Sequence, residues 1–311
     1  MSKRIKVIGS TLVGLSTVVG SIFALTKYKS NQRHQQTVPP FFNGIAPYVF
    51  AHRGGLARRP EHTILAFDDA QAHGVDGFET DVRLSRDGTL IVFHDGDVDR
   101  VTDGSGRVAD HHLDELKALD AGYHFTDING AHPYRQHPDA KILTFDEMLK
   151  LYPDMYINVD LKDHPDSPEG QRVPKIIYDI IQENQAMSRV LVTSFYATQI
   201  ERFREISRGL VAVGASQKEV TEAFVKRMIG FGHTYTPRAH TFQIPTAFYG
   251  IPLARRAFIH WLISRNIVPG FYVINSVDEM IDLYEMGAHT IVTDRVDLAE
   301  QFKNRIKPIL E

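Results

Sequence analysis

The stretch GFETDVRLSRDGTLIVFHD, residues 77–95, decides the fold. Two β-like runs, residues 77–82 and 91–94, flank Asp87-Gly88, a dipeptide typical of tight β-hairpins. A parallel pairing of these runs would need a crossover of a dozen or more residues, for which there is no room. We therefore predict that the second run returns antiparallel along the first.

A two-residue loop at Asp87-Gly88 would also set the register of the hairpin. Asp81 then lies directly opposite His94 on the same face of the sheet. Glu79 precedes Asp81 by two residues and shares that face, because side chains alternate along a strand. The turn chemistry thus predicts two carboxylates and a histidine close together.

Outward from this hairpin, short apolar runs alternate with helical patterns. Strands are expected at residues 48–52, 77–82, 155–161, 190–194, 210–214, 241–244, 270–274 and 290–293. Helices are expected at residues 63–73, 145–151, 173–184, 197–206, 219–231, 253–265, 277–286 and 297–306. This alternation predicts an α/β fold, a (β/α)8 TIM barrel with a β-hairpin after its second strand. Active sites of such barrels lie at the carboxyl ends of the strands, where the sequence places His52, Asp81, Lys162 and Asp294.

Composition excludes several classes of function. The net charge of −3 gives no basic field for nucleic acid. The chain has no cysteine, which removes disulfides, thiolate catalysis and cysteine-based metal sites.

The N-terminus differs from the rest of the chain. Residues 7–25, VIGSTLVGLSTVVGSIFAL, carry no charge and have basic residues on both sides. A run of this length can span a bilayer as a helix. We predict an N-terminal membrane anchor in residues 1–29, a linker at 30–44 and the barrel at 45–311, held outside the cytoplasm by a single transmembrane helix. The alternative is a cleaved signal peptide and a secreted protein.

Three acidic residues at predicted strand ends suggest a metal site. Glu79 and Asp81 are spaced to hold one cation, and the segment NVDLK, residues 158–162, adds Asp160 on a neighbouring strand. Three carboxylates favour one divalent cation, Mg²⁺ or Ca²⁺, over softer metals.

The remaining polar residues suggest the handling of a phosphate. In FAHRGGLARRPEHT, residues 50–63, His52 and Arg53 precede two glycines. Arginine binds anions with a planar fork of donors, and Lys162 adds a second cation. His52 and His94 could supply an acid and a base.

These motifs together resemble the glycerophosphodiester phosphodiesterase family. The resemblance rests on HRGG, PEHT, FETDVRLSRDGTLIVFHD, VTDGSG, VDLK and IVTDR, in the family's order over residues 47–300. It implies hydrolysis of glycerophosphodiesters to sn-glycerol 3-phosphate and an alcohol. It makes His52 and His94 the acid/base pair, Arg53 and Lys162 the phosphate binders, and Glu79, Asp81 and Asp160 the ligands of one divalent metal. Glu61 matches an acid close to the metal, and residues 95–140 match an insertion that partly covers the site.

Three positions depart from the family pattern. His62 stands where the family usually has Asn, and Asp160 where it usually has Glu. Tyr272 of YVIN stands in the position of a family tryptophan, which makes it a substrate-contacting candidate. These changes leave the specificity for the alcohol open.

The resemblance also implies a mechanism. One histidine deprotonates a hydroxyl of the substrate's own glycerol, which attacks phosphorus, and the other protonates the departing alcohol. The sequence does not assign the two roles. An alternative substrate is a lysophospholipid or a glycerophosphate polymer, cleaved by the same site. A non-catalytic, membrane-tethered binding protein is the third hypothesis.

Overall fold

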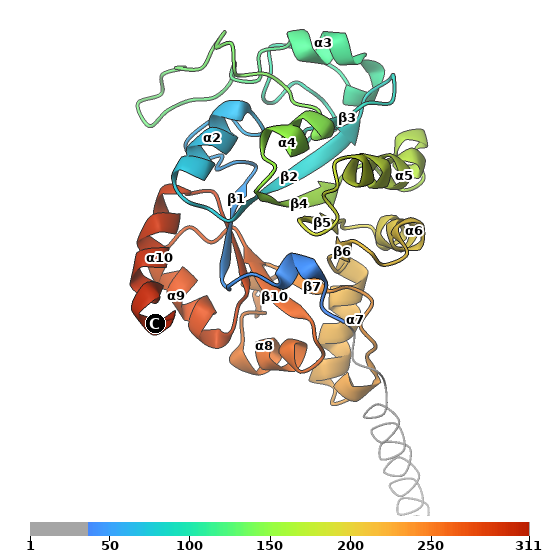
Figure 1. Ribbon diagram of the computed structural model, residues 1–311, viewed down its shortest axis with the longest axis vertical. Helices are drawn as coiled ribbons and strands as arrows, with labels where there is room; N and C mark the ends of the chain where they lie inside the picture. The colour runs from blue at the N-terminus through green and yellow to red at the C-terminus, as the bar shows by residue number, and fades with distance from the viewer. Residues whose placement is uncertain (1–36, 311) are drawn as a thin grey trace, which may run out of the picture.

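The computed structural model describes residues 37–310, and in this part of the chain eight parallel strands form a near-closed barrel (Figure 1). The sheet order is β6-β5-β4-β2-β1-β11-β10-β7, and a bridge between Gly214 and Thr241 joins its two edges. The strands are β1 (Tyr48–His52), β2 (Gly77–Leu84), β4 (Tyr156–Leu161), β5 (Val190–Thr193), β6 (Ala212–Val213), β7 (Thr241–Ile244), β10 (Val268–Tyr272) and β11 (Thr290–Thr293).

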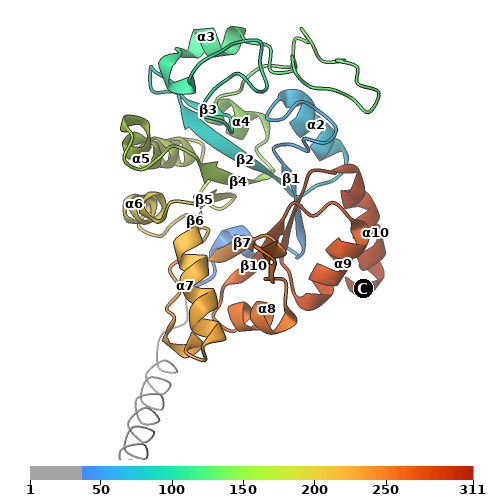
Figure 2. The ribbon, with the colours of Figure 1, turned by 180° about the vertical axis from the view of Figure 1, so that it is seen from behind.

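Helices surround the barrel on its outside (Figures 1 and 2). They bury their apolar faces against the strands, in a core that holds aliphatic and aromatic residues of both layers. Their bounds are α2 (Ile64–Ala72), α4 (Phe145–Leu151), α5 (Pro168–Glu183), α6 (Ala197–Ser207), α7 (Gln217–Met228), α8 (Arg256–Ile263), α9 (Val277–Met286) and α10 (Asp297–Leu310). The predicted α/β barrel is confirmed.

The hairpin after β2 exists, but its predicted register is wrong by one residue. Strand β3 (Leu90–Val92) pairs antiparallel with β2 so that Val82 faces Val92. The loop has three residues between Ser85 and Thr89, and Gly88 takes φ +85° there, as the last residue of such a loop often does. The backbone carbonyl of Asp81 therefore accepts a hydrogen bond from the N–H of Phe93, and Asp81 is not directly opposite His94.

The end of the barrel away from the site is closed by aromatic residues. The 3₁₀ helix η1 (Pro40–Phe42) places Phe41 and Phe42 in a buried cluster with Tyr48 and Phe50. The rings of Phe41 and Phe50 stack with centroids 6.1 Å apart. The packed domain therefore already includes residues that the sequence analysis assigned to the linker at 30–44.

After β3 the chain leaves the barrel in an insertion. It runs through η2 (Val108–Asp110) and α3 (Leu113–Ala118) before it returns to α4, and it lies beyond β3 and α4 in both views (Figures 1 and 2). Its own small core includes Ile91, Phe93, Val98 and Leu116. The predicted insertion at 95–140 falls within this segment.

Two differences from the predicted elements have local causes. Helix α5 begins at Pro168, five residues before the predicted start, because Ser167 caps it and Pro168 suits the first turn. Between β7 and α8 the chain forms an unpredicted two-stranded hairpin, β8 (Ala247–Phe248) with β9 (Ile251–Pro252), so α8 starts later than expected. Earlier in the chain, η3 (Gly232–Thr234) lies between α7 and β7.

The predicted membrane anchor at residues 7–25 lies outside the described residues. Among residues 37–310 no helix is long and apolar enough to cross a bilayer.

Candidate active site

Strand register brings the predicted residues together at the carboxyl end of the barrel. His52 on β1 is the register partner of Glu79 on β2, and Asp81 on β2 is the partner of Asp160 on β4. These four side chains line one cavity together with Arg53, His94, Lys162 and Tyr272. The structure thus gathers every predicted site residue except Glu61 on the cavity wall.

His52 is held by a carboxylate from the last barrel strand. Its Nδ1 lies 2.5 Å from Oδ1 of Asp294, which follows β11 directly. The side-chain amide of Asn275 donates to the other oxygen of Asp294 at 2.7 Å. Burial disfavours the charged ring, but the hydrogen bond to Asp294 and the charge of Glu79 together raise the pKa of His52 above its ordinary value.

His94 has a similar partner but a different electrostatic setting. Its Nδ1 lies 2.5 Å from Oδ1 of Asp95. Burial of the ring lowers the pKa of His94 below its ordinary value, and the nearby cations of Arg53 and Lys162 lower it further. The carboxylates of Asp81 and Asp95 act in the opposite direction but do not outweigh these effects. The two histidines are therefore biased toward opposite protonation states at neutral pH.

Glu61 lies behind the site, between two arginines. Arg53 donates to its Oε1 at 3.0 Å, and Arg100 from the insertion donates to both of its oxygens, at 2.7 and 2.9 Å. Burial opposes ionisation of Glu61, but the hydrogen bonds from Arg100 outweigh it and lower the pKa of Glu61 to about 2. Arg100 also pairs with Asp95, so one chain of ionic contacts links Arg53 to the carboxylate that orients His94.

The loop after β1 brings Arg53 into the site through an unusual backbone. Arg53 takes φ +51°, and Gly54 and Gly55 follow with φ +83° and +95°. A Cβ at Gly54 would lie 2.7 Å from Cβ of Ala66, so the chain needs glycine there. Positive φ in residues other than glycine is uncommon and costs energy. His62 and Val273 beside the site show it as well, with φ +61° each.

The predicted metal ligands lie close to Lys162. The Lys162 ammonium is 3.0 Å from Asp81 Oδ1 and 2.7 Å from Asp160 Oδ2. These contacts raise the pKa of Lys162 against the effect of burial. Within residues 37–310 no three acidic or histidine side chains are arranged as a metal-ligand group.

Two features of the carboxylates nevertheless fit a cation. Asp81 Oδ2 and Asp160 Oδ1 are buried, and neither accepts a hydrogen bond from the described part of the chain. Burial, followed by the negative charge of Asp81, raises the pKa of Glu79 to about 7. Oδ2 of Asp81 has ion-pair contacts with Arg53 and His62, both at 3.4 Å. Buried carboxylate oxygens that accept no hydrogen bond are costly, and carboxylate oxygens are the ligands that Mg²⁺ and Ca²⁺ prefer.

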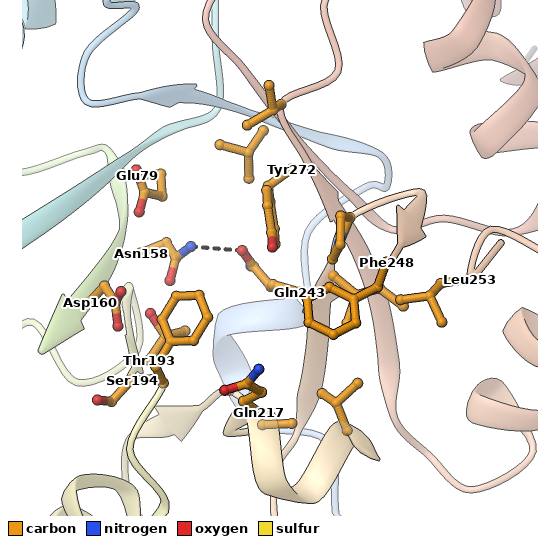
Figure 3. A pocket seen from close by; sticks show the side chains of 18 of the residues that line it. Glu79, Asn158, Asp160, Thr193, Ser194, Gln217, Gln243, Phe248, Leu253 and Tyr272 are labelled. Carbon is orange, nitrogen blue, oxygen red and sulfur yellow. Dashed lines mark hydrogen bonds between the residues drawn. The ribbon is translucent and has the colours of Figure 1, made fainter. Parts of the chain in front are cut away.

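Two residues that the sequence analysis missed form part of the cavity floor. The amide of Asn158 on β4 donates to Gln243 Oε1 on β7 at 2.8 Å across the barrel, and Tyr272 lies beside this pair (Figure 3). His62, in place of the family's Asn, is buried with Nε2 at 3.4 Å from Asp81 Oδ2. Asn158 could have been found from the two-residue period of NVDLK, but nothing in the sequence around Gln243 marks it as its partner.

Comparison with known proteins identifies the family of the chain. Residues 52–298 match the model of the Glycerophosphoryl diester phosphodiesterase family. The chain belongs to this family. Membership makes it an enzyme of the phosphoric diester hydrolase class.

Similarity to individual members of the phosphodiesterase family extends over most of the chain. The glycerophosphodiester phosphodiesterase of Bacillus subtilis is 27% identical over 260 residues, which cover 81% of this chain and 85% of the relative. A second Bacillus subtilis protein assigned to the same activity, YhdW, is 36% identical over 253 residues, with 80% and 95% covered.

Solved structures of the family share the fold. A glycerophosphoryl diester phosphodiesterase domain from Mycobacterium tuberculosis aligns with a TM-score of 0.73 at 23% identity, covering 83% of this chain and 100% of that one. A phosphodiesterase from Oleispira antarctica, determined in complex with the product sn-glycerol-3-phosphate, aligns with a TM-score of 0.66 at 22% identity, covering 84% and 97%.

Proposed function

We propose that this phosphodiesterase hydrolyses glycerophosphodiesters to sn-glycerol 3-phosphate and an alcohol, with His52 and His94 as its proton-transfer pair. The observation that carries the proposal is the convergence of two histidines, two cations and three carboxylates on one cavity at the carboxyl ends of the barrel strands. Arg53 and Lys162 supply the positive charge that a phosphodiester needs.

The opposite pKa shifts of the two histidines support a division of roles. His94, whose pKa is lowered, is neutral at pH 7 and suits the base that takes a proton from the glycerol hydroxyl. His52, whose pKa is raised, holds its proton more readily and suits the acid that gives a proton to the departing alcohol. The hydroxyl oxygen forms a bond to phosphorus as the bond to the alcohol oxygen breaks, and water then opens the cyclic phosphate.

A divalent cation, Mg²⁺ or Ca²⁺, fits the acidic end of the site. Glu79, Asp81 and Asp160 would hold it, and the oxygens of Asp81 and Asp160 that accept no hydrogen bond within residues 37–310 support this assignment. A bound cation would supply positive charge to stabilise the developing charge on the phosphate. Glu61 has a supporting role through Arg53, and Tyr272 would contact the substrate from the barrel floor.

Membrane attachment through residues 7–25 remains part of the proposal. The uncharged run and its basic flanks support a single-pass anchor with the barrel outside the cytoplasm. Fractionation followed by N-terminal sequencing tests it, and a soluble form that begins after residue 25 would replace the anchor with a cleaved signal peptide.

The activity is tested with glycerophosphocholine and three histidine variants. The full chain should release choline, and His52→Ala and His94→Ala should each lower kcat by about 10² to 10⁴-fold. His260→Ala is the matched control, because this histidine is exposed on α8 and does not line the cavity. Normal turnover by both site variants would contradict the assignment of the histidines.

A further inference from the structure

The predicted catalytic residues occupy only one end of the cavity. The cavity has a volume of about 590 Å³ and extends from His52 and Lys162 to helix α7 and the β8–β9 hairpin. Glu79 and Asp160 lie on one side, whereas Phe248 and Leu253 lie on the other (Figure 3). A volume of this size suits one elongated ligand of moderate size.

Helix α7 presents an apolar stripe to the far end of the cavity. Val220, Phe224 and Met228 follow one another at four-residue spacing and so share a face of the helix, with Val225 on the adjacent row. Val225 is 47% exposed and Met228 is 67% exposed. A surface helix ordinarily places polar residues at such positions.

The β8–β9 hairpin forms a second apolar wall at this end. Phe248 and Ile251 are direct cross-strand partners, and they are 45% and 47% exposed. Tyr249 and Gly250 join them in a tight turn, both with positive φ. The backbone N–H groups of Leu253 and Ala254 donate to the carbonyl of Thr246 at 2.8 and 3.0 Å, which fixes the base of the hairpin.

The described residues that line this end carry no charged side chain. From Gln217 of α7 to Leu253 they are aliphatic or aromatic apart from three neutral polar residues, Gln217, Thr221 and Gln243. A large apolar surface open to water is unfavourable and marks a ligand groove or an interaction site. A polar glycerophosphate polymer would gain nothing from such a wall, whereas a hydrocarbon chain would.

We propose that the apolar end binds the single long chain of an amphiphilic phosphodiester whose phosphate lies against Arg53 and Lys162. The inference rests on the proposed function, because the phosphate must occupy the predicted catalytic end. A 1-acyl lysophospholipid meets both requirements, since it has one chain and keeps the free glycerol hydroxyl that attacks phosphorus. A glycerophosphodiester whose departing alcohol carries the chain, such as a glycerophospho-N-acylethanolamine, has the same chemistry.

The test measures kcat/KM of the full chain for two substrate series. The first series consists of glycerophosphocholine and the lysophosphatidylcholines that carry a 1-butanoyl to 1-decanoyl chain. The second consists of glycerophosphoethanolamine and its N-butanoyl to N-decanoyl derivatives. All compounds are kept below the concentrations at which they form micelles. Each buried methylene strengthens binding by up to about fourfold. We expect kcat/KM to rise at least about 100-fold from the chain-free to the decanoyl compound in one series. The series that rises shows which side of the phosphate carries the chain.

Two substitutions test whether the apolar wall causes the rise. Phe248→Asp and Val225→Asp place a charge beside the chain at positions that are already about half exposed. Each should lower the ratio of decanoyl to chain-free kcat/KM by about tenfold or more. Leu210→Asp is the matched control, because Leu210 is 58% exposed and lies outside the cavity; its ratio should equal that of the unmodified chain.

The outcomes separate this inference from the proposed function. Hydrolysis of the chain-free compounds with no gain along either series would overturn the acyl-chain site and leave the proposed function standing. A gain that survives both Asp variants would place the chain elsewhere and overturn the site as well. If no compound in either series is hydrolysed, the proposed function is wrong and the inference falls with it.

Discussion

Nδ1 of His52 and Oδ1 of Asp294 lie 2.5 Å apart, so a side-chain hydrogen bond joins the end of the first barrel strand to the residue after the last. Interaction with His52 and Asn275 lowers the pKa of Asp294 against the effect of burial, so its carboxylate is ionised and accepts a hydrogen bond from Nδ1–H of His52. Nε2 of His52 is then the nitrogen that faces the carboxylate side of the cavity, 3.8 Å from Glu79. Asp294 therefore orients the histidine that we assign as the acid and favours its protonated form.

Asp294→Asn should weaken catalysis through His52 and change the pH profile. Loss of the charge leaves the ring poorly oriented, and we expect kcat to fall by about 10² to 10⁴-fold. It also removes a contribution that raises the pKa of His52. Because the acid must be protonated, activity falls as the pH rises through that pKa. The alkaline limb of the kcat/KM profile should therefore move to lower pH, and an unshifted limb would show that Asp294 acts only on folding.

A substrate with a good leaving group should separate the roles of the two histidines. The leaving group of glycerophospho-p-nitrophenol departs as p-nitrophenolate, without a proton, so hydrolysis of this compound does not need the acid. His52→Ala should lower turnover of this compound far less than turnover of glycerophosphocholine, by a difference of about 10²-fold or more. His94→Ala should slow both substrates alike, because the hydroxyl still needs a base. The reverse pattern would exchange the two assignments.

Removal of divalent cations should abolish turnover. Glu79, Asp81 and Asp160 repel one another in a buried site, and a cation relieves that repulsion. Calorimetry should detect one Mg²⁺ or Ca²⁺ per chain, and Glu79→Ala should weaken the affinity by about tenfold or more. Full activity in excess EDTA would contradict the metal assignment, whatever the calorimetry shows.

Arg100 should contribute to catalysis although it does not line the cavity. It joins Glu61 to Asp95, and Asp95 orients His94. Arg100→Ala should lower kcat roughly tenfold with little change in KM. Without Arg100, Asp95 holds His94 less firmly, and the ring spends less time in the orientation that accepts the proton. Arg107→Ala is the control, since this arginine of the same insertion is exposed and its nearest acid, Asp110, lies 3.9 Å away. Equal kcat in both variants would show that Arg100 does not contribute to catalysis.

The barrel could be predicted because its strands and helices have clear local signals. Strands β1, β7 and β11 coincide with their predicted bounds, and eight parallel strands occur in the expected order. The hairpin register could not be predicted from Asp87-Gly88 alone. Ser85 and Thr89 form additional hydrogen bonds that lengthen the loop to three residues, and one residue is enough to change every partner on the strand.

The residues of the candidate site could be predicted from the sequence although the predicted hairpin register is wrong. Asp81 and His94 were expected to be directly opposite each other, and they reach the same cavity from neighbouring levels instead. Side-chain contacts between distant parts of the chain could not be predicted from the sequence. The Asn158–Gln243 bond and the Arg100–Glu61 pair join residues that no local pattern connects.

The apolar end of the cavity was also invisible in the sequence. The β8–β9 hairpin lies between the strand predicted at 241–244 and the helix predicted at 253–265, and its two short strands have too few residues for a clear alternation. The apolar residues of α7 predict a buried helix face equally well. Only the structure places Phe224 and Phe248 on the same cavity as His52.

Phosphorus NMR of the reaction with glycerophosphocholine tests the central claim most directly. The full chain with Mg²⁺ or Ca²⁺ should convert the diester into sn-glycerol 3-phosphate, with one choline released per phosphate, and His52→Ala should leave the diester signal in place. Formation of phosphocholine would mean that the bond on the glycerol side breaks, and an unchanged diester signal would mean no hydrolysis. Either result would contradict the account.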